Sequence, residues 1–459
     1  MIKKLLSYSM FIFILLVCTS REQDFTACEQ NLADSLSLSD SSPTIIYNES
    51  NNQDRANMLF PSYTTPKLDD NNSNNSNNSE IINRSKSEGK HVSFAEVDSE
   101  QSENICTTPV LINDKDEVAI YIYCQDQLNY FINNVSQEFK QSLTKVVISM
   151  SIAELPQSCF ANCVSLDTVI FMNKVMCIGN NAFAGCTNLK VLDLTVARPL
   201  VIGKCAFSRC KSLSTILFSN NTVLIGSGAF QSCESLSNIY LPENINYVGD
   251  CAFSDCTSLK RVMFPRNMQP IFPGGTLYNY LLQKWSFKPE PSLGKFAFSN
   301  CSSLELICLP DNLNHIGIGC FQNCSSLKSI KIPLSVSCIN DDTFMGCTSL
   351  SQIFLHNGIV YIGESAFESC WSINEIVVPL NVSSIKYRTF YDCKSLTELY
   401  MPFYISYIEK EAIDGCNIKN IHVYNKEQLS ETSLDPYNLY NALENYFKCS
   451  SIEKLPQID

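Results

Sequence analysis

Between residues 160 and 416, a large apolar residue is followed three positions later by a cysteine eleven times. The pairs are Phe160/Cys163, Phe183/Cys186, Phe207/Cys210, Phe230/Cys233, Phe253/Cys256, Phe298/Cys301, Phe321/Cys324, Phe344/Cys347, Phe367/Cys370, Phe390/Cys393 and Ile413/Cys416. Successive cysteines lie 23 residues apart, except for one step of 24 (Cys186 to Cys210) and one of 45 (Cys256 to Cys301). A fixed period in this range predicts a solenoid, in which each unit buries its apolar side against its neighbours.

Each unit follows the pattern I-G-x-x-A-F-x-x-C-x-S-L-x-x-I-x-L-P. The segment L-x-x-I-x-L alternates between apolar and polar positions, which predicts a short strand, and the proline that follows ends it. We expect Gly226 and Gly249 to turn the chain with positive φ. The segment A-F-x-x-C is compact enough for one helical turn packed against the strands. The pattern therefore predicts an α/β repeat solenoid of about 23-residue units with short parallel strands, capped at both ends.

The repeat resembles the BspA-like, or Treponema-type, leucine-rich repeat over roughly residues 143–424. Asn340, Lys386 and Glu409 replace the repeat glycine, which leaves the turn geometry of those units open. The resemblance implies a surface protein, because members of this family are known as surface proteins of bacteria and mucosal protists, and several of them are adhesins.

The composition divides the chain into five parts. Residues 1–20 carry a basic start, an apolar run and small residues, as a secretory signal peptide does. The next part is rich in Ser and Asn and cannot bury enough apolar surface to fold. We expect a signal peptide at 1–20, a disordered arm at 21–109, an N-terminal helical cap at 110–142, the solenoid at 143–424 and a C-terminal cap at 425–459. No later apolar run is long enough to span a membrane, so we expect no transmembrane span in the mature chain.

Two segments interrupt the regular repeat. Leu128, Phe131, Ile132, Val135 and Phe139 follow helical spacing, which predicts one amphipathic helix over the open end of the core. The 45-residue step predicts an inserted loop near 269–292, since insertions in solenoids map to loops and often to the binding side. A degenerate repeat is the alternative for this segment.

The net charge and the positions of the cysteines exclude several classes of function. The net charge of −13 argues against nucleic-acid binding. Cysteine at one repeat position predicts a column of buried free thiols rather than metal ligands, because cysteine behaves as a small apolar residue. The four histidines are isolated and no Cys-x-x-Cys occurs. We therefore expect no enzyme, no metal and no cofactor.

The strand residue between the two inward apolar positions must point outward, because strand side chains alternate. Its occupants are mostly apolar or aromatic: Ile170, Asp193, Leu217, Tyr240, Met263, Cys308, Lys331, Phe354, Val377, Tyr400 and His422. Such a patch is typical of an interaction site, although β-branched and aromatic residues also simply favour strands. The candidate ligand-binding residues are Tyr240, Met263, Lys331, Phe354, Tyr400 and His422, together with Trp285 of the inserted segment.

The hypothesis for function is a secreted or extracellular cell-surface protein that binds protein or glycan ligands on host cells, matrix or other cells through its strand face. The alternative is a non-adhesive protein–protein interaction scaffold, intracellular or secreted.

Overall fold

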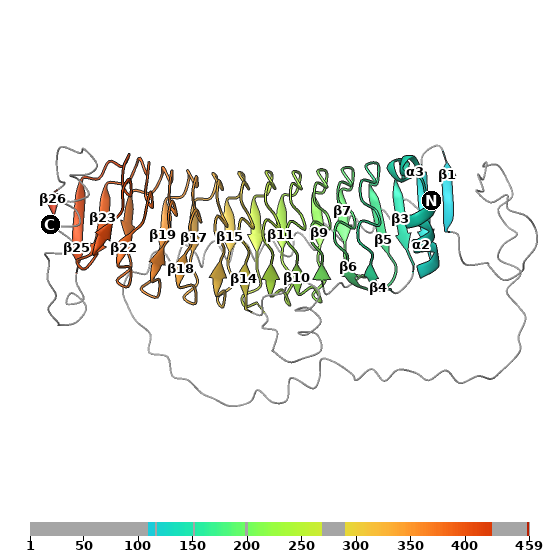
Figure 1. The fold of residues 1–459 in the computed structure, drawn as a ribbon, viewed down its shortest axis with the longest axis horizontal. Helices are drawn as coiled ribbons and strands as arrows, with labels where there is room; N and C mark the ends of the chain where they lie inside the picture. The colour runs from blue at the N-terminus through green and yellow to red at the C-terminus, as the bar shows by residue number, and fades with distance from the viewer. Residues whose placement is uncertain are drawn as a thin grey trace, which may run out of the picture.

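The computed structural model describes residues 109–114, 117–149, 152–197, 201–268 and 290–424, together with a short strand at 457–458. The expected signal peptide, the arm up to residue 108 and most of the expected C-terminal cap lie outside these ranges. The described units stack along one long axis, with the N-terminal end at one tip and β25 near the other (Figure 1). Within the described ranges, no helix is long and apolar enough to cross a membrane. The prediction of a parallel-strand solenoid with a 23-residue period is confirmed.

Each unit contributes one strand to each of two parallel layers. The first sheet holds the strands predicted from L-x-x-I-x-L: β3 Lys145–Ile148, β5 Thr168–Phe171, β7 Val191–Asp193, β9 Thr215–Leu217, β11 Asn238–Tyr240, β13 Arg261–Met263, β15 Leu306–Cys308, β17 Ser329–Lys331, β19 Gln352–Phe354, β21 Glu375–Val377, β23 Glu398–Pro402 and β25 Asn420–Tyr424. β26 Gln457–Ile458 pairs with β25.

In each unit, the strand of the second sheet comes directly before the position of the repeat glycine. Its strands are β4 Ile152–Leu155, β6 Val175–Ile178, β8 Val201–Ile202, β10 Leu224–Ile225, β12 Tyr247–Val248, β14 Ser292–Leu293, β16 His315–Ile316, β18 Cys338–Ile339, β20 Tyr361–Ile362, β22 Ser384–Ile385 and β24 Tyr407–Ile408. From β4 to β16 they form one continuous seven-stranded sheet. Because one side chain of each strand points inward, the two sheets enclose a single apolar core.

The third side of each unit is built from turns, so the expected helical turn at A-F-x-x-C is wrong. The Phe230 amide donates to Ala252 O of the next unit (2.8 Å), while Cys233 N donates to Phe230 O (3.3 Å). Gly228 and Ser232 on either side of Phe230 have φ of 63° and 59°. Backbone donors that bond to the next unit are not available for an α-helix within the unit.

The expectation that the repeat glycines Gly226 and Gly249 turn the chain with positive φ is also wrong. Neither Gly226 nor Gly249 has positive φ. A Cβ on Gly226 would lie 2.8 Å from Gly203 C, and one on Gly249 would lie 2.6 Å from Ser227 N. In these units glycine is therefore required because the backbone of the preceding unit leaves no room for a side chain. The stack continues where the glycine is replaced.

The repeated phenylalanines form one column along the axis of the core. The ten rings from Phe160 to Phe390 are fully buried. Neighbouring centroids lie between 5.2 Å (Phe160 and Phe183) and 5.9 Å (Phe298 and Phe321). Such offset stacking adds to the free energy gained by burying the rings.

The repeat cysteines form a second column of free thiols, as expected, and ten of the eleven are buried. Each thiol from Cys186 to Cys416 donates to the carbonyl of the phenylalanine one unit earlier, as Cys233 Sγ does to Phe207 O (3.4 Å). Burial raises the pKa of Cys210 and Cys347 to about 12. The column therefore stays protonated at neutral pH and serves packing rather than nucleophilic chemistry.

The single expected cap helix is two short helices, α2 Gln125–Asn134 and α3 Gln137–Ser142. Ser136 divides them, because its hydroxyl caps α3 by accepting from Phe139 N (3.2 Å). The Phe131 ring lies 5.2 Å from Phe160 and so continues the phenylalanine column into the cap.

Two strands precede these helices, which the hydrophobic pattern did not indicate. β1 Val110–Asp114 pairs antiparallel with β2 Glu117–Ile122, and β2 pairs parallel with β3. The first sheet therefore extends beyond the first repeat.

The solenoid is continuous across the undescribed residues 269–289. β12 pairs directly with β14, and β13 pairs directly with β15. The Phe253 and Phe298 rings on either side are stacked at 5.5 Å. The units on the two sides of the gap are therefore neighbours in the stack.

Candidate functional site

The outward side chains at the third strand position of the first sheet form a column from Ile170 to His422, here called the ladder. Its members lie in register: Tyr240 is opposite Met263, and Lys331 is opposite Phe354. Phe354 is 59% exposed and Val377 is 50% exposed, whereas the inward Ile376 is 2% exposed. Alternation along short strands thus places large apolar side chains on the surface.

The candidate residues fall into three groups along the ladder. Tyr240 and Met263 are on β11 and β13, Lys331 and Phe354 on β17 and β19, and Tyr400 and His422 on β23 and β25. Trp285 lies outside the described residues.

One ladder position differs chemically from the others. Cys308 follows Met263 in the register and is half-buried. It is disulfide-bonded, so this position presents no thiol.

Tyr400 and His422, the last of the three groups, are held by ring stacking and by polar contacts. The Tyr400 and His422 rings are stacked with centroids 4.3 Å apart. His422 Nε2 lies 2.8 Å from Glu398 Oε2, and Asn420 Nδ2 donates to both carboxylate oxygens at 3.1 and 3.2 Å. The hydrogen bond with His422, followed by that from Asn420, lowers the pKa of Glu398. The carboxylate is therefore held ionised beside two rings.

Glu398 and Asn420 belong to a second outward column, which sequence reasoning missed. It lies two residues before the ladder and is mostly polar: Thr168, Val191, Thr215, Asn238, Arg261, Leu306, Ser329, Gln352, Glu375, Glu398 and Asn420. The same alternation that identifies the ladder predicts these residues, since positions i and i+2 share a face.

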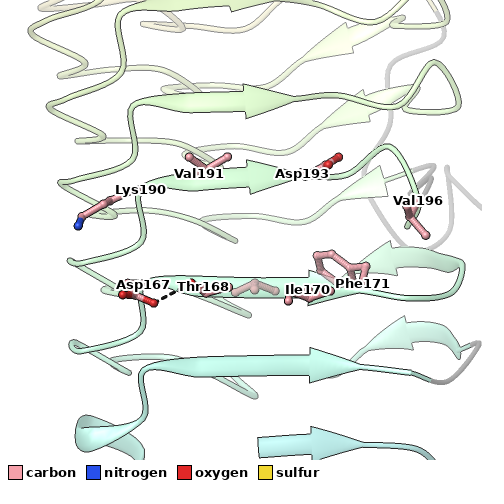
Figure 2. Close-up of a pocket in the computed structure, with 9 residues that line it drawn as sticks. Asp167, Thr168, Ile170, Phe171, Lys190, Val191, Asp193 and Val196 are labelled. Atoms are coloured by element: carbon pink, nitrogen blue, oxygen red, sulfur yellow. Dashed lines mark hydrogen bonds between the residues drawn. The ribbon is translucent and has the colours of Figure 1, made fainter. Parts of the chain in front are cut away.

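A groove of about 380 Å³ opens at the N-terminal part of this face, between β5 and β7. Within the first sheet, these two strands belong to separate hydrogen-bonded groups of strands, β1-β2-β3-β5 and β7-β9. Figure 2 shows Asp167 and Lys190 at one end of the groove and Phe171 and Val196 at the other. The ladder face therefore includes a depression that has a polar end and an apolar end.

The described residues offer no centre for metal chemistry, because no three His, Cys, Asp or Glu side chains among them are arranged to hold an ion. The face instead provides apolar side chains, aromatic edges and charged groups spread over many units. Such a surface suits recognition of a large partner.

A stack of short parallel strands with one apolar column per repeat position defines a leucine-rich repeat solenoid. The chain belongs to the family described as the BspA type leucine rich repeat region, whose model matches residues 130–223, 196–290, 276–397, 314–434 and 362–456. No curated protein matches the sequence.

Several solved structures are similar in fold. A leucine-rich repeat protein from Bacteroides ovatus is 23% identical, with 77% of this chain and 97% of that one covered and a TM-score of 0.35. A leucine rich cell surface protein from Faecalibacterium prausnitzii is 17% identical, with 73% and 100% covered and a TM-score of 0.36. The pneumococcal vaccine antigen PcpA is 16% identical, with 69% and 78% covered and a TM-score of 0.42. At these identities the similarity concerns the fold, and we transfer no residue role.

Proposed function

We propose that this chain is a secreted or cell-surface protein that binds macromolecular partners through the ladder face of its first sheet. Its partners would be proteins or glycans on host cells, matrix or neighbouring cells. The family and the N-terminal signal-like segment support this location.

The observation that carries the proposal is the apolar column over neighbouring units, which is exposed at Phe354 and Val377 and half-buried at Tyr400. Phe354, Val377 and Tyr400 lie on β19, β21 and β23, at the same repeat position. A face with only a structural role has no need of large apolar side chains in water, and contiguous exposed apolar patches mark interaction sites. Aromatic residues commonly supply most of the affinity of such interfaces.

A second function, a non-adhesive scaffold that joins protein partners, would use the same surface. Such a scaffold could be intracellular or secreted, and an intracellular one differs from the proposed function in location rather than in geometry. Antibody staining of unpermeabilised cells separates them, because only a surface protein is labelled.

The test of the binding surface is a triple variant with Phe354→Ser, Val377→Ser and Tyr400→Ser. We expect attachment to cells or matrix to weaken by about 2 kcal/mol or more, roughly 30-fold in Kd, on the scale of one interface hot spot. Folding should be nearly unchanged, because these side chains lie outside the core.

The matched control replaces three exposed apolar residues away from the ladder, namely Leu334→Ser, Val360→Ser and Tyr407→Ser. These side chains are 77%, 51% and 58% exposed. We expect this variant to bind like the wild type. Equal loss in both variants, or no loss in the ladder variant, contradicts the proposal.

A further inference from the structure

The turns on the third side of the solenoid carry one large aromatic residue where the other units have smaller or polar ones. Trp371 directly follows the repeat cysteine Cys370 and is 43% exposed. The equivalent residues of the other ten units are Val164, Thr187, Lys211, Glu234, Thr257, Ser302, Ser325, Thr348, Lys394 and Asn417. The Trp371 ring does not belong to the apolar core, so the packing of the units does not require it.

The indole of Trp371 lies beside a carboxylate and an ammonium group of the next unit. Its Nε1 donates to Asp392 Oδ2 (3.1 Å), and Lys394 Nζ lies 4.2 Å from the ring centroid. Lys394 Nζ also lies 3.3 Å from Asp392 Oδ2. A cation is therefore held between an aromatic face and a carboxylate. The side chain of Lys394 is 55% exposed, so another cation reaches this position from solvent and replaces the lysine at little cost.

A second cation on the same side is held in the same way, here by an arginine. Arg388 Cζ lies 4.4 Å from the ring centroid of Tyr391 and 5.3 Å from that of Tyr387. Its Nε lies 2.7 Å from Glu411 Oε2, and its Nη1 lies 3.7 Å from Glu368 Oε1. A planar guanidinium thus fits among the rings and carboxylates of these turns, because it stacks on a ring while it bonds to an acid.

The turns of the last four units are also acidic. Residues 340–348, 363–371, 386–394 and 409–417 contain eight Asp or Glu and four Lys or Arg. The seven preceding turns contain three acidic and four basic residues, at 156–164, 179–187, 203–211, 226–234, 249–257, 294–302 and 317–325. Negative charge is therefore concentrated on the third side around Trp371.

The crowding of these carboxylates is visible at Asp342. Burial, followed by the charges of Asp341, Glu368 and Glu364, raises the pKa of Asp342. A basic group of a partner would relieve this repulsion between like charges. The acidic turns thus favour a basic partner over an acidic or a neutral one.

We propose that Trp371, Tyr387, Arg388, Tyr391 and Asp392 form a second protein-binding surface, here called the turn site, which takes an arginine-bearing basic segment of a partner protein. An arginine of the partner replaces Lys394 between the Trp371 ring and Asp392. Trp, Tyr and Arg are the residues that most often dominate the affinity of an interface. The turn site belongs to the third side and the ladder to the first sheet, so the inference does not depend on what the ladder binds.

Titration of the full chain with a basic peptide tests the proposal. The probe is fluorescently labelled hexa-arginine, and the site variant is Trp371→Thr, which leaves the net charge unchanged and introduces the residue type of Thr348 at the equivalent position. We expect the wild type to bind saturably and Trp371→Thr to bind at least about 10-fold more weakly. The variant should fold, because the ring lies outside the core.

The matched control is Phe354→Thr, which removes an exposed aromatic ring from the ladder without a change in charge. It should bind hexa-arginine like the wild type. Equal affinity of Trp371→Thr and the wild type, equal loss in both variants, or no saturable binding to the wild type would overturn the proposal.

Removal of Lys394 separates exchange at the ring from general attraction to a negatively charged protein. Lys394→Ala should bind hexa-arginine about 3-fold more tightly or better, because the ring and the carboxylate become free for the peptide. Lys211→Ala removes the same charge at the same repeat position, where Lys211 Nζ lies 2.9 Å from Glu234 Oε1. This control should change the affinity less, and equal effects of the two variants contradict the proposed exchange.

A neutral glycan is the competing ligand for an exposed indole. The same titration with cellohexaose should show no saturable binding to the wild type. Binding of cellohexaose that is lost in Trp371→Thr would assign the ring to a glycan and overturn the proposal.

Discussion

At the scale of single residues, the turns on the third side of the solenoid and the repeat glycine obey different constraints. Two positions in each of eleven units have left-handed backbone, and 17 of these residues are not glycine while five are. A non-glycine residue there costs about 1–2 kcal/mol, which the hydrogen bonds between units offset. The repeat glycine, by contrast, is selected for space.

This difference predicts unequal effects of two alanine substitutions. Gly249→Ala places a Cβ 2.6 Å from Ser227 N and 2.7 Å from Gly226 C, so backbone must shift. We expect a loss of about 2–3 kcal/mol in the free energy of unfolding. In Gly228→Ala the closest atom to the added Cβ is Cys205 Sγ at 3.0 Å, a side-chain atom, and the backbone has φ of 63°, so we expect a loss of about 1 kcal/mol. Urea denaturation of both variants checks the order, and a larger loss for Gly228→Ala would contradict it.

At the scale of elements, each strand of the first and second sheets depends on the strand in the next unit. Most have only two or three residues, too few to be stable alone. Side chains also connect neighbouring strands, as Asn420 and His422 on β25 do through Glu398 on β23.

This connection predicts a pH-dependent effect of Asn420→Ala. The pKa of Glu398 is lowered from its usual 4.5 by hydrogen bonds from His422 and Asn420. A carboxyl whose pKa is depressed by folding stabilises the fold above its unfolded pKa, and this contribution is lost as pH falls through the folded pKa. We expect the variant to melt at a lower temperature than the wild type near neutral pH, and the difference to disappear well below pH 4.5.

The control for this experiment is Asn238→Ala, at the equivalent position on β11. Asn238 Nδ2 donates to Ser237 Oγ at 3.5 Å, which is a neutral hydroxyl instead of a carboxylate. Its effect on the melting temperature should not vary with pH over the same range. A constant difference for Asn420→Ala would show that the side chain acts through packing alone.

At the scale of the whole molecule, stability is distributed along the stack, because each unit contacts only its neighbours. The phenylalanine column passes through every unit from the cap residue Phe131 to Phe390. A defect in the middle of the column therefore weakens two interfaces, whereas a change at an exposed ladder residue such as Phe354 leaves the core contacts between units in place.

Phe230→Ala tests this arrangement. The ring lies 5.4 Å from Phe207 and 5.3 Å from Phe253 and is fully buried. We expect a loss of about 3–5 kcal/mol in the free energy of unfolding, because the cavity adds to the lost burial. Hydrogen exchange should rise in the units on both sides. Phe354→Ala on the exposed ladder is the control and should change stability little; an unchanged denaturation midpoint for Phe230→Ala would contradict the proposed column.

The sequence by itself determined the period, the two buried columns and the face on which the ladder lies. These features are predictable because contacts in a solenoid recur one period apart, so residues such as Phe230 and Cys233 reveal their neighbours at Phe253 and Cys256. The ladder follows from strand alternation alone.

Only the tertiary structure decided how the units fit against one another. It showed that A-F-x-x-C is a pair of turns rather than a helical turn, because the amide of Phe230 bonds to the next unit. It also showed that Gly249 is required by the backbone of the preceding unit. Both findings depend on distances between segments of backbone, and a pattern of residue types does not contain those distances.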